Sequence, residues 1–166
     1  VLGLCPGAEF GPSKRWPEYH YAAVARDWIG QGGRVWLFGS AKDRPVAEQI
    51  VGALPDAQRS EAAILAGATS LEQAVDLLSV TDAVVSNDSG LMHIAAALGR
   101  PLVAVYGSTS PGFTPPLGEA VAIERLGLEC SPCFQRECPL GHLNCLRQLE
   151  PDRVIQALAR LPGAPR

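Results

Sequence analysis

The segment SNDSGLMHIAAALGR, residues 86–100, combines polar side chains, a glycine and a helical pattern in a way that suits anion binding. Asp88 and Ser89 follow an apolar run and precede Gly90, which opens an alanine-rich helix. The first N–H groups of a helix are free and lie at the positive end of its dipole, so a phosphate is favoured there. Glycine lets a bulky anion approach the backbone closely. Asp88 would repel a phosphate, and we expect its carboxylate to accept hydrogen bonds from sugar hydroxyls instead.

A purely structural interpretation of the same residues is also open. An Asp or Ser before a helix is most often an N-cap, which accepts a hydrogen bond from the first turn. His93, one turn further on, could be a half-buried helix residue, and Lys14 could be a solvated loop charge. The choice between the two interpretations depends on what else lies near this turn.

Two more turns carry similar chemistry, GAEFGPSKRW at 7–16 and GSAKD at 39–43. Each follows a predicted strand, and the carboxyl ends of parallel strands meet at one edge of a sheet, where ligands bind. Together the three turns supply a cation in Lys14, acids in Asp43 and Asp88, and bare backbone amides. This convergence favours a binding site for a nucleotide-sugar diphosphate.

The elements that must position these turns alternate between strand and helix. Apolar runs such as LVAVY are continuous, as in parallel strands buried on both faces. The sequence therefore predicts an α/β fold, a Rossmann-like parallel sheet with helices on both faces. We expect strands at 1–4, 34–38, 62–65, 82–86, 102–106 and 121–125, helices at 18–31, 43–54, 71–79, 89–98 and 151–161, and a frayed end at 162–166.

Bulk composition excludes several classes of protein. The 166 residues suit one domain, and the net charge of −3 offers no basic field for nucleic acid. No apolar stretch is long enough for a transmembrane segment, and the start VLGLCPGAEF resembles no signal peptide. Because that start lacks Met and enters directly on a strand, we expect a piece of a longer protein. The glycine-rich dinucleotide fingerprint, the Walker lysine motif and the Gly-x-Ser-x-Gly elbow are absent.

Five cysteines occupy two different settings. Cys5 ends a predicted strand without a histidine beside it in sequence, and we interpret it as a buried thiol. The other four interrupt the periodic pattern at 127–148, in CSPCFQRECPLGHLNC. A C-x2-C pair suits a structural zinc site, while reduced or adventitiously oxidised thiols remain alternatives. A redox-active pair is disfavoured, because the pair lies in a loop rather than at a helix start. The candidate zinc ligands are Cys130, Cys133, Cys138, Cys145 and His142.

The motifs PGAEFGPSKRWP, LFGSAKD, NDSGLMHIAAALGRPLVAVYG and FTPP, in this order, resemble the ADP-heptose:lipopolysaccharide heptosyltransferases of glycosyltransferase family 9, especially their heptosyltransferase II branch. The resemblance covers almost the whole chain. It implies the C-terminal, donor-binding half of a two-domain GT-B enzyme, with an N-terminal half that holds the lipid A-core acceptor and the aspartate base. It further implies an inverting transfer of heptose from ADP-heptose that requires no divalent metal.

The resemblance also assigns roles to individual residues. Lys14 would neutralise the donor's phosphate, Asp43 would bind the nucleotide ribose, and Thr69 would line the adenine pocket. The D-[ST]-G-x-x-H signature around the diphosphate and heptose corresponds to Asp88, Ser89, Gly90 and His93. Some relatives carry hydroxyl residues before the lysine. This sequence has Glu9 and Phe10 there instead, and in this it resembles the heptosyltransferase II branch.

On this interpretation the chain is one domain, 1–166, without the acceptor domain, and transfers no heptose alone. Its location would be cytoplasmic and at most peripheral to the inner membrane. Two alternatives remain: half of a GT-B sugar-nucleotide epimerase, and a zinc-dependent module that binds nucleic acid or protein. The stretch PGAEFGPSKRW argues against the first, and the scarcity of lysine argues against the second.

Overall fold

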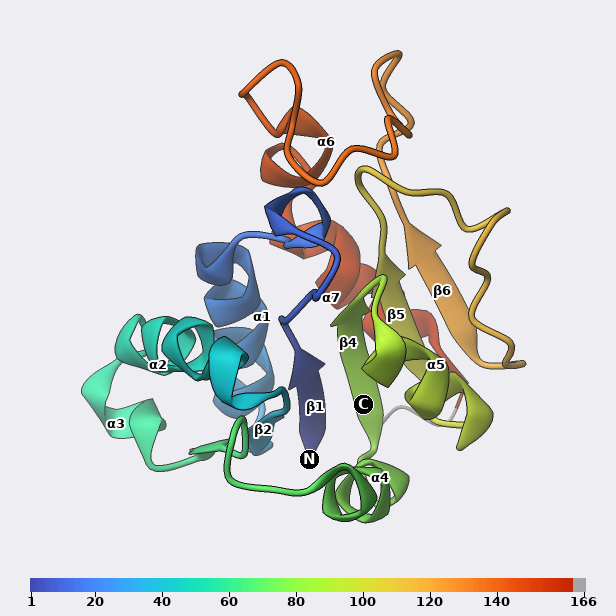
Figure 1. Ribbon diagram of the computed structural model, residues 1–166. Helices are drawn as coiled ribbons and strands as arrows, with labels where there is room; N and C mark the ends of the chain where they lie inside the picture. Colours follow the sequence, from blue (N-terminus) through green and yellow to red (C-terminus); the bar gives the residue numbers. More distant parts are fainter. Residues whose placement is uncertain (163–166) are drawn as a thin grey trace.

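The sheet contains six parallel strands in the order β3-β2-β1-β4-β5-β6 (Figure 1). The computed structural model describes residues 1–162, so the predicted frayed end lies almost wholly outside the described residues. The observed strands agree with the predicted ones to within two residues at each end. They are β1 Leu2–Cys5, β2 Val35–Leu37, β3 Ala62–Ile64, β4 Ala83–Asn87, β5 Leu102–Val105 and β6 Val121–Glu124.

The helices with an apolar periodicity were also predicted correctly. These are α1 Glu18–Gly30, α2 Arg44–Gly52, α4 Leu71–Ser79, α5 Gly90–Ala97 and α7 Pro151–Arg160. The sequence missed four short elements because three or four residues are too few to show a period. They are the 3₁₀ helices η1 Pro12–Lys14 and η2 Ala41–Asp43, and the single-turn helices α3 Asp56–Arg59 and α6 Asn144–Arg147.

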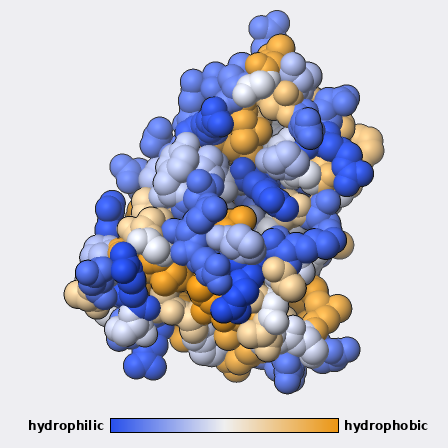
Figure 2. All heavy atoms as spheres, turned by 60° about the vertical axis from the view of Figure 1, so that its left-hand side comes forward, coloured by the Kyte–Doolittle hydropathy of each residue, from blue (hydrophilic) through white to orange (hydrophobic). Residues whose placement is uncertain are grey.

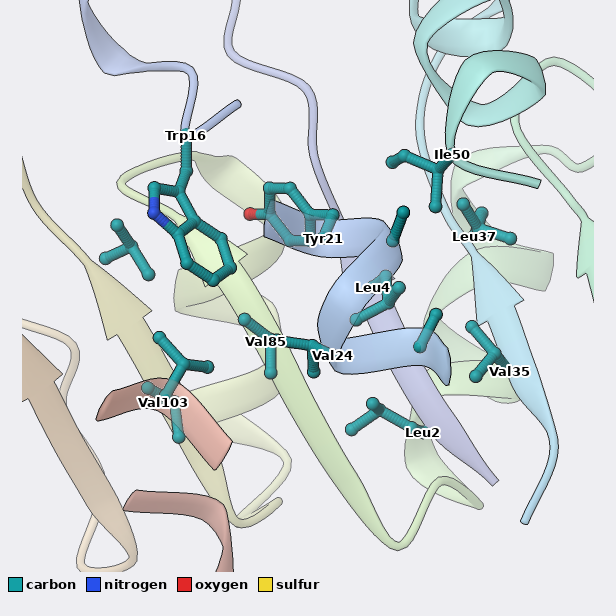
Figure 3. Close-up of a cluster of buried hydrophobic side chains, with 14 of the residues drawn as sticks. Leu2, Leu4, Trp16, Tyr21, Val24, Val35, Leu37, Ile50, Val85 and Val103 are labelled. Atoms are coloured by element: carbon teal, nitrogen blue, oxygen red, sulfur yellow. The ribbon is translucent and has the colours of Figure 1, made fainter. Parts of the chain in front are cut away.

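Alternate residues of each central strand are buried on opposite faces of the sheet, as the continuous apolar runs indicated. On the face covered by α1, α2 and α7, Leu4 and Val85 belong to the larger hydrophobic core (Figure 3). Val84 belongs to a second core on the other face, which α4 and α5 cover. Helices thus protect both faces of the sheet from water. The turns at the carboxyl ends of its strands remain available for binding a ligand.

Figure 3 shows how the loop after β1 is anchored to the larger core. Trp16 and Tyr21 lie above the sheet with their rings edge to face at a centroid distance of 5.0 Å. Both side chains are almost completely buried. The loop between β1 and α1 therefore has a fixed end, which matters because this loop carries Lys14.

The strand order reverses direction between β1 and β4. From β1 the chain proceeds through β2 to β3 on one side, and from β4 it proceeds through β5 to β6 on the other. Open parallel sheets bind ligands at the carboxyl ends of the strands beside such a switch point. The turns after β1 and β4 are therefore the first place to look for a site.

The face of the molecule shown in Figure 2 is largely polar. In Figure 2, hydrophilic residues cover much of the visible face, and apolar residues appear between them. Within residues 1–162 no helix is both long and apolar enough to cross a bilayer.

Candidate functional site

A cavity of about 710 Å³ lies at the carboxyl edge of the sheet, beside the switch point. This volume is within the range of small-molecule sites. The three turns singled out in the sequence form its wall, together with the start of α4. Every residue proposed from the sequence as a donor contact lines it: Lys14, Asp43, Thr69, Asp88, Ser89, Gly90 and His93.

Lys14 and Asp88 form a nearly buried ion pair in this wall. The distance from Lys14 Nζ to Asp88 Oδ2 is 2.7 Å, and the side chains are only 13% and 3% exposed. Thr109 donates a hydrogen bond of 2.6 Å to the same oxygen, and the Thr114 hydroxyl donates to Oδ1 at 3.2 Å. Phe10 adds a cation–π contact, with Lys14 Nζ 5.0 Å from its ring centroid.

This pairing adds a contact that the sequence did not predict. Lys14 and Asp88 were expected at different parts of a ligand, the phosphate and the sugar. In the structure Asp88 holds the ammonium group of Lys14, and its carboxylate already has three protein donors. The geometry therefore favours Asp88 as the residue that positions Lys14 at the cavity wall.

The start of α5 is open toward the cavity. Ser89 occupies the N-cap position, but its side chain makes no capping hydrogen bond and instead lies 3.3 Å from the hydroxyl of Ser86. The N-cap interpretation of this motif is therefore wrong. A Cβ atom placed on Gly90 would meet no atom within 4 Å, so the space before this residue is free. The first turn of α5 thus presents N–H groups to the cavity, as an anion site requires.

The start of α4, on another wall of the cavity, shows the opposite behaviour. Ser70 accepts a hydrogen bond from the N–H of Gln73 at 3.2 Å, and the Gln73 side chain accepts one from the Ser70 N–H at 2.9 Å. This is a complete capping box, in which the side chains of Ser70 and Gln73 pair with the free N–H groups at the start of the helix. The polar cap leaves no open helix start here, in contrast to α5.

Asp43 and Thr69 lie on the side of the cavity formed by the turns after β2 and β3. Asp43 Oδ2 accepts hydrogen bonds from the N–H and the hydroxyl of Ser40, at 2.9 and 2.8 Å. Gly7 must be glycine here, because a Cβ would lie 2.5 Å from the Asp43 carboxyl carbon. Thr69 donates a weak hydrogen bond of 3.4 Å to the carbonyl of Leu65. Both residues are thus held by their own turns, and both line the cavity.

His93 and Cys5 lie in opposite environments. His93 is exposed rather than half-buried and lines the cavity from α5. Cys5 is only 1% exposed, and burial raises the pKa of its thiol to about 12. The interpretation of Cys5 as a buried thiol at the end of a strand is confirmed.

Asn87, the last residue of β4, is the most important structural residue that the sequence analysis overlooked. Its Oδ1 accepts hydrogen bonds from the N–H of Trp16 at 3.1 Å and the hydroxyl of Tyr21 at 3.0 Å. Its Nδ2 donates to the carbonyl of Pro6 at 2.7 Å. Asn87 is completely buried, and it fastens the loop that carries Lys14 to β4.

Thr109, Thr114 and Phe10 were also missed as contacts of Lys14 and Asp88. Thr114 lies in FTPP, residues 113–116, one of the motifs shared with the family. That motif was the available sign that Thr114 belongs to the site. Thr109 carries no motif of its own, because only the fold brings the turn after β5 beside the turn after β4.

The fold and the cavity define a Rossmann-like domain with a cavity at its switch point whose lining suits an anion. The comparisons with known proteins identify its family. The model of glycosyltransferase family 9 (heptosyltransferase) matches residues 1–144, and the chain belongs to this family.

Individual relatives agree with that assignment. The chain is 60% identical over 126 residues to lipooligosaccharide heptosyltransferase 2 of Haemophilus influenzae, covering 76% of this chain and 36% of the relative. It is 48% identical to lipopolysaccharide heptosyltransferase 2 of Escherichia coli, covering 97% of this chain and 46% of the relative. The chain thus spans less than half the length of these relatives.

Solved structures give the same result. The E. coli ADP-heptose LPS heptosyltransferase II matches with a TM-score of 0.86 and 48% identity, over 95% of this chain and 45% of the other. The E. coli heptosyltransferase WaaC with ADP matches with a TM-score of 0.75 and 26% identity, over 96% and 43%. The predicted family and the Rossmann-like fold are therefore confirmed.

Proposed function

We propose that this chain is the donor-binding half of an inverting glycosyltransferase that moves heptose from ADP-heptose to the inner core of lipopolysaccharide. One observation carries the proposal. Lys14 and the uncapped start of α5 face the same cavity at the β1/β4 switch point. Family membership, and the similarity to a heptosyltransferase solved with ADP, support ADP as the nucleotide.

The chain's own residues would act mainly on the leaving group. Negative charge develops on the diphosphate as ADP leaves the sugar carbon, so groups that stabilise this charge lower the barrier. Lys14 supplies a positive charge that Asp88 holds in place, and the N–H groups after Ser89 supply a dipole. Lys14 is held by Asp88 and the N–H groups by the helix itself, so neither has to reorganise as the charge develops.

The remaining cavity residues suit the other parts of the donor. Asp43 Oδ2 is engaged with Ser40, which leaves Oδ1 for a ribose hydroxyl. Thr69 lies beside the start of α4, where an adenine would fit against the side chains of Leu71 and Ala74. His93 lies one turn along α5 from the proposed phosphate position, within reach of the sugar. The acceptor, the lipid A-core, and the proton acceptor are assigned by this proposal to the other half of a GT-B enzyme.

Family membership favours this function over both alternatives. A GT-B epimerase half and an independent zinc-dependent binding module would not explain a match to the heptosyltransferase model over residues 1–144.

Calorimetric titration of the chain tests the proposed donor site. We expect ADP and ADP-heptose to bind weakly, because a GT-B donor is held between two domains, and UDP and GDP to give no measurable heat. A folded chain that binds neither ADP nor ADP-heptose at millimolar concentration would refute the proposal. Equal binding of all three nucleotides would refute the assignment of the base.

A further inference from the structure

The four clustered cysteines surround a second, much smaller cavity. Within this cavity of about 20 Å³ the lining includes all four thiol side chains together with His142. None of the four forms a disulfide bond. The cavity lies against Ser13 and Ser108, which are buried beneath the cysteine-rich segment. The members of the cluster are Cys130, Cys133, Cys138 and Cys145.

The four cysteines lie close to one another around this cavity. The N–H of Leu143 donates a hydrogen bond of 3.4 Å to Cys138 Sγ, so the backbone of the same segment holds this sulfur. Cys145 is buried, whereas Cys130, Cys133 and Cys138 are only partly buried. An ion could therefore reach the cluster from solvent and find four sulfur donors around one cavity.

The size and the donor set of the cavity restrict the ion. A volume of about 20 Å³ holds roughly one water-sized body, which is too small for an iron–sulfur cluster. Four sulfur donors, or three with a histidine nitrogen, favour a single tetrahedral thiophilic ion such as Zn²⁺. His142 Nδ1 already accepts a hydrogen bond of 3.0 Å from Asn144 N, so Nε2 is its available ring nitrogen.

Metal binding requires the side chains to turn. As they stand, no three of the His, Cys, Asp and Glu side chains within residues 1–162 are arranged to hold a metal ion. A cysteine has only one side-chain torsion before its sulfur, and the four thiols already line one cavity. Rotation about the Cα–Cβ bonds is therefore the movement that would bring the sulfurs to a common centre.

The same segment supports the turn that carries Lys14. Ser13 N–H donates to the carbonyl of Arg136 at 3.2 Å, and the Ser13 hydroxyl donates to the carbonyl of Gln135 at 2.5 Å. Arg136 Nε donates in return to the carbonyl of Phe10 at 2.7 Å. Gly11, with φ of 157°, lies so close that a Cβ there would collide with the Arg136 carbonyl oxygen. Residues 135 and 136 lie between Cys133 and Cys138. Binding of one ion by the four thiols would therefore fix these contacts.

We propose that Cys130, Cys133, Cys138 and Cys145 bind a single thiophilic divalent metal ion, and that the loop closed in this way holds the Lys14 turn in its binding position. His142 is the alternative fourth ligand. The metal site stands on the cysteine cluster alone, whereas its effect on ADP rests on the proposed donor site.

Metal analysis of the chain purified from zinc-supplemented medium tests the site. We expect about one Zn²⁺ per chain, its loss in Cys133→Ser and Cys138→Ser, and its retention in the control Cys5→Ala, which lies outside the cluster. Replacement of the metal by Co²⁺ in the unsubstituted chain should give the absorption bands of tetrahedral thiolate coordination. This second measurement does not depend on whether the cysteine variants fold. A folded chain that binds no Zn²⁺ or Co²⁺, and shows four titratable thiols or two disulfides in this segment, would overturn the proposal.

Calorimetry with ADP tests the coupling to Lys14. Removing Zn²⁺ with a chelator should weaken ADP binding several-fold, and returning Zn²⁺ should restore it. Unchanged ADP affinity after complete metal loss would overturn the positioning role. If the zinc-loaded chain binds no ADP at all, the proposed donor site fails, while the metal count still decides the metal site.

Discussion

Replacing Lys14 with alanine is expected to weaken the binding of ADP and of ADP-heptose by about 10- to 150-fold. A charge-assisted contact to a phosphate contributes roughly 1.5–3 kcal/mol, which corresponds to this range of affinity. The variant also leaves the Asp88 carboxylate, only 3% exposed, without its cation and beside the proposed diphosphate. The effect should therefore lie toward the upper end of the range, as measured by calorimetry.

The chain provides a matched control in its other lysine. Lys42 is 80% exposed and makes only a surface ion pair with Glu9 at 3.6 Å. Such pairs contribute little, so Lys42→Ala should change ADP affinity less than about twofold. Equal losses in the two lysine variants would mean that overall charge, and not the buried pair, determines binding.

A double-mutant cycle separates positioning by Asp88 from sugar binding. If Asp88 positions Lys14, Asp88→Ala should weaken ADP and ADP-heptose to a similar degree, and the Lys14→Ala/Asp88→Ala variant should bind ADP better than Lys14→Ala alone. If Asp88 holds sugar hydroxyls, as the sequence interpretation expected, Asp88→Ala should weaken ADP-heptose and spare ADP. Calorimetry of the three variants with both ligands distinguishes these outcomes.

Replacing Asn87 with alanine should lower the free energy of unfolding by about 3 kcal/mol or more. The change leaves the Trp16 N–H and the Pro6 carbonyl buried without their partner, at about 1–3 kcal/mol for each group. It also removes the nearer acceptor of the Tyr21 hydroxyl, at 3.0 Å, and leaves only the longer hydrogen bond of 3.4 Å to the Cys5 carbonyl. Domains of this size are stable by only about 5–15 kcal/mol, so urea unfolding should show a large shift of the midpoint.

Ser86→Ala is the control on the same strand. Ser86 is as buried as Asn87, but its hydroxyl mainly donates one local hydrogen bond of 2.8 Å to the Asn87 carbonyl. Its loss should cost about 1 kcal/mol. If the two variants are equally stable, Asn87 does not fasten the loop to β4 as the structure indicates.

Local pattern was sufficient to predict most of the fold. Continuous apolar runs identified the strands, and the period of helices such as α1 and α4 identified their apolar faces. The strand-end chemistry of Lys14, Asp43 and Asp88 was placed at one sheet edge because parallel strands leave no other arrangement. Short elements such as η1 were missed because three residues carry no period.

The contacts within the site were harder to predict because they join distant parts of the chain. Lys14 meets Asp88 across 74 residues, and Ser13 meets Gln135 across 122. Nothing local in the sequence marks such a pair. Asn87 illustrates the same difficulty, since a polar residue at a strand end looks like a turn residue until the fold brings Trp16 and Pro6 to it.

The substitution Gly90→Ala, followed by titration with ADP, tests most directly whether a phosphate binds at the start of α5. Apart from its chain neighbours and the backbone of its own helix, the added methyl group would meet no protein atom within 4 Å, and the backbone is helical, so stability should be unchanged or slightly higher. It would instead occupy the space in which the phosphate approaches the backbone. We predict a loss of about 10-fold or more in ADP affinity at unchanged melting temperature, in line with the loss of a charge-assisted hydrogen bond. Unchanged ADP affinity in this variant would contradict a diphosphate site at the switch point.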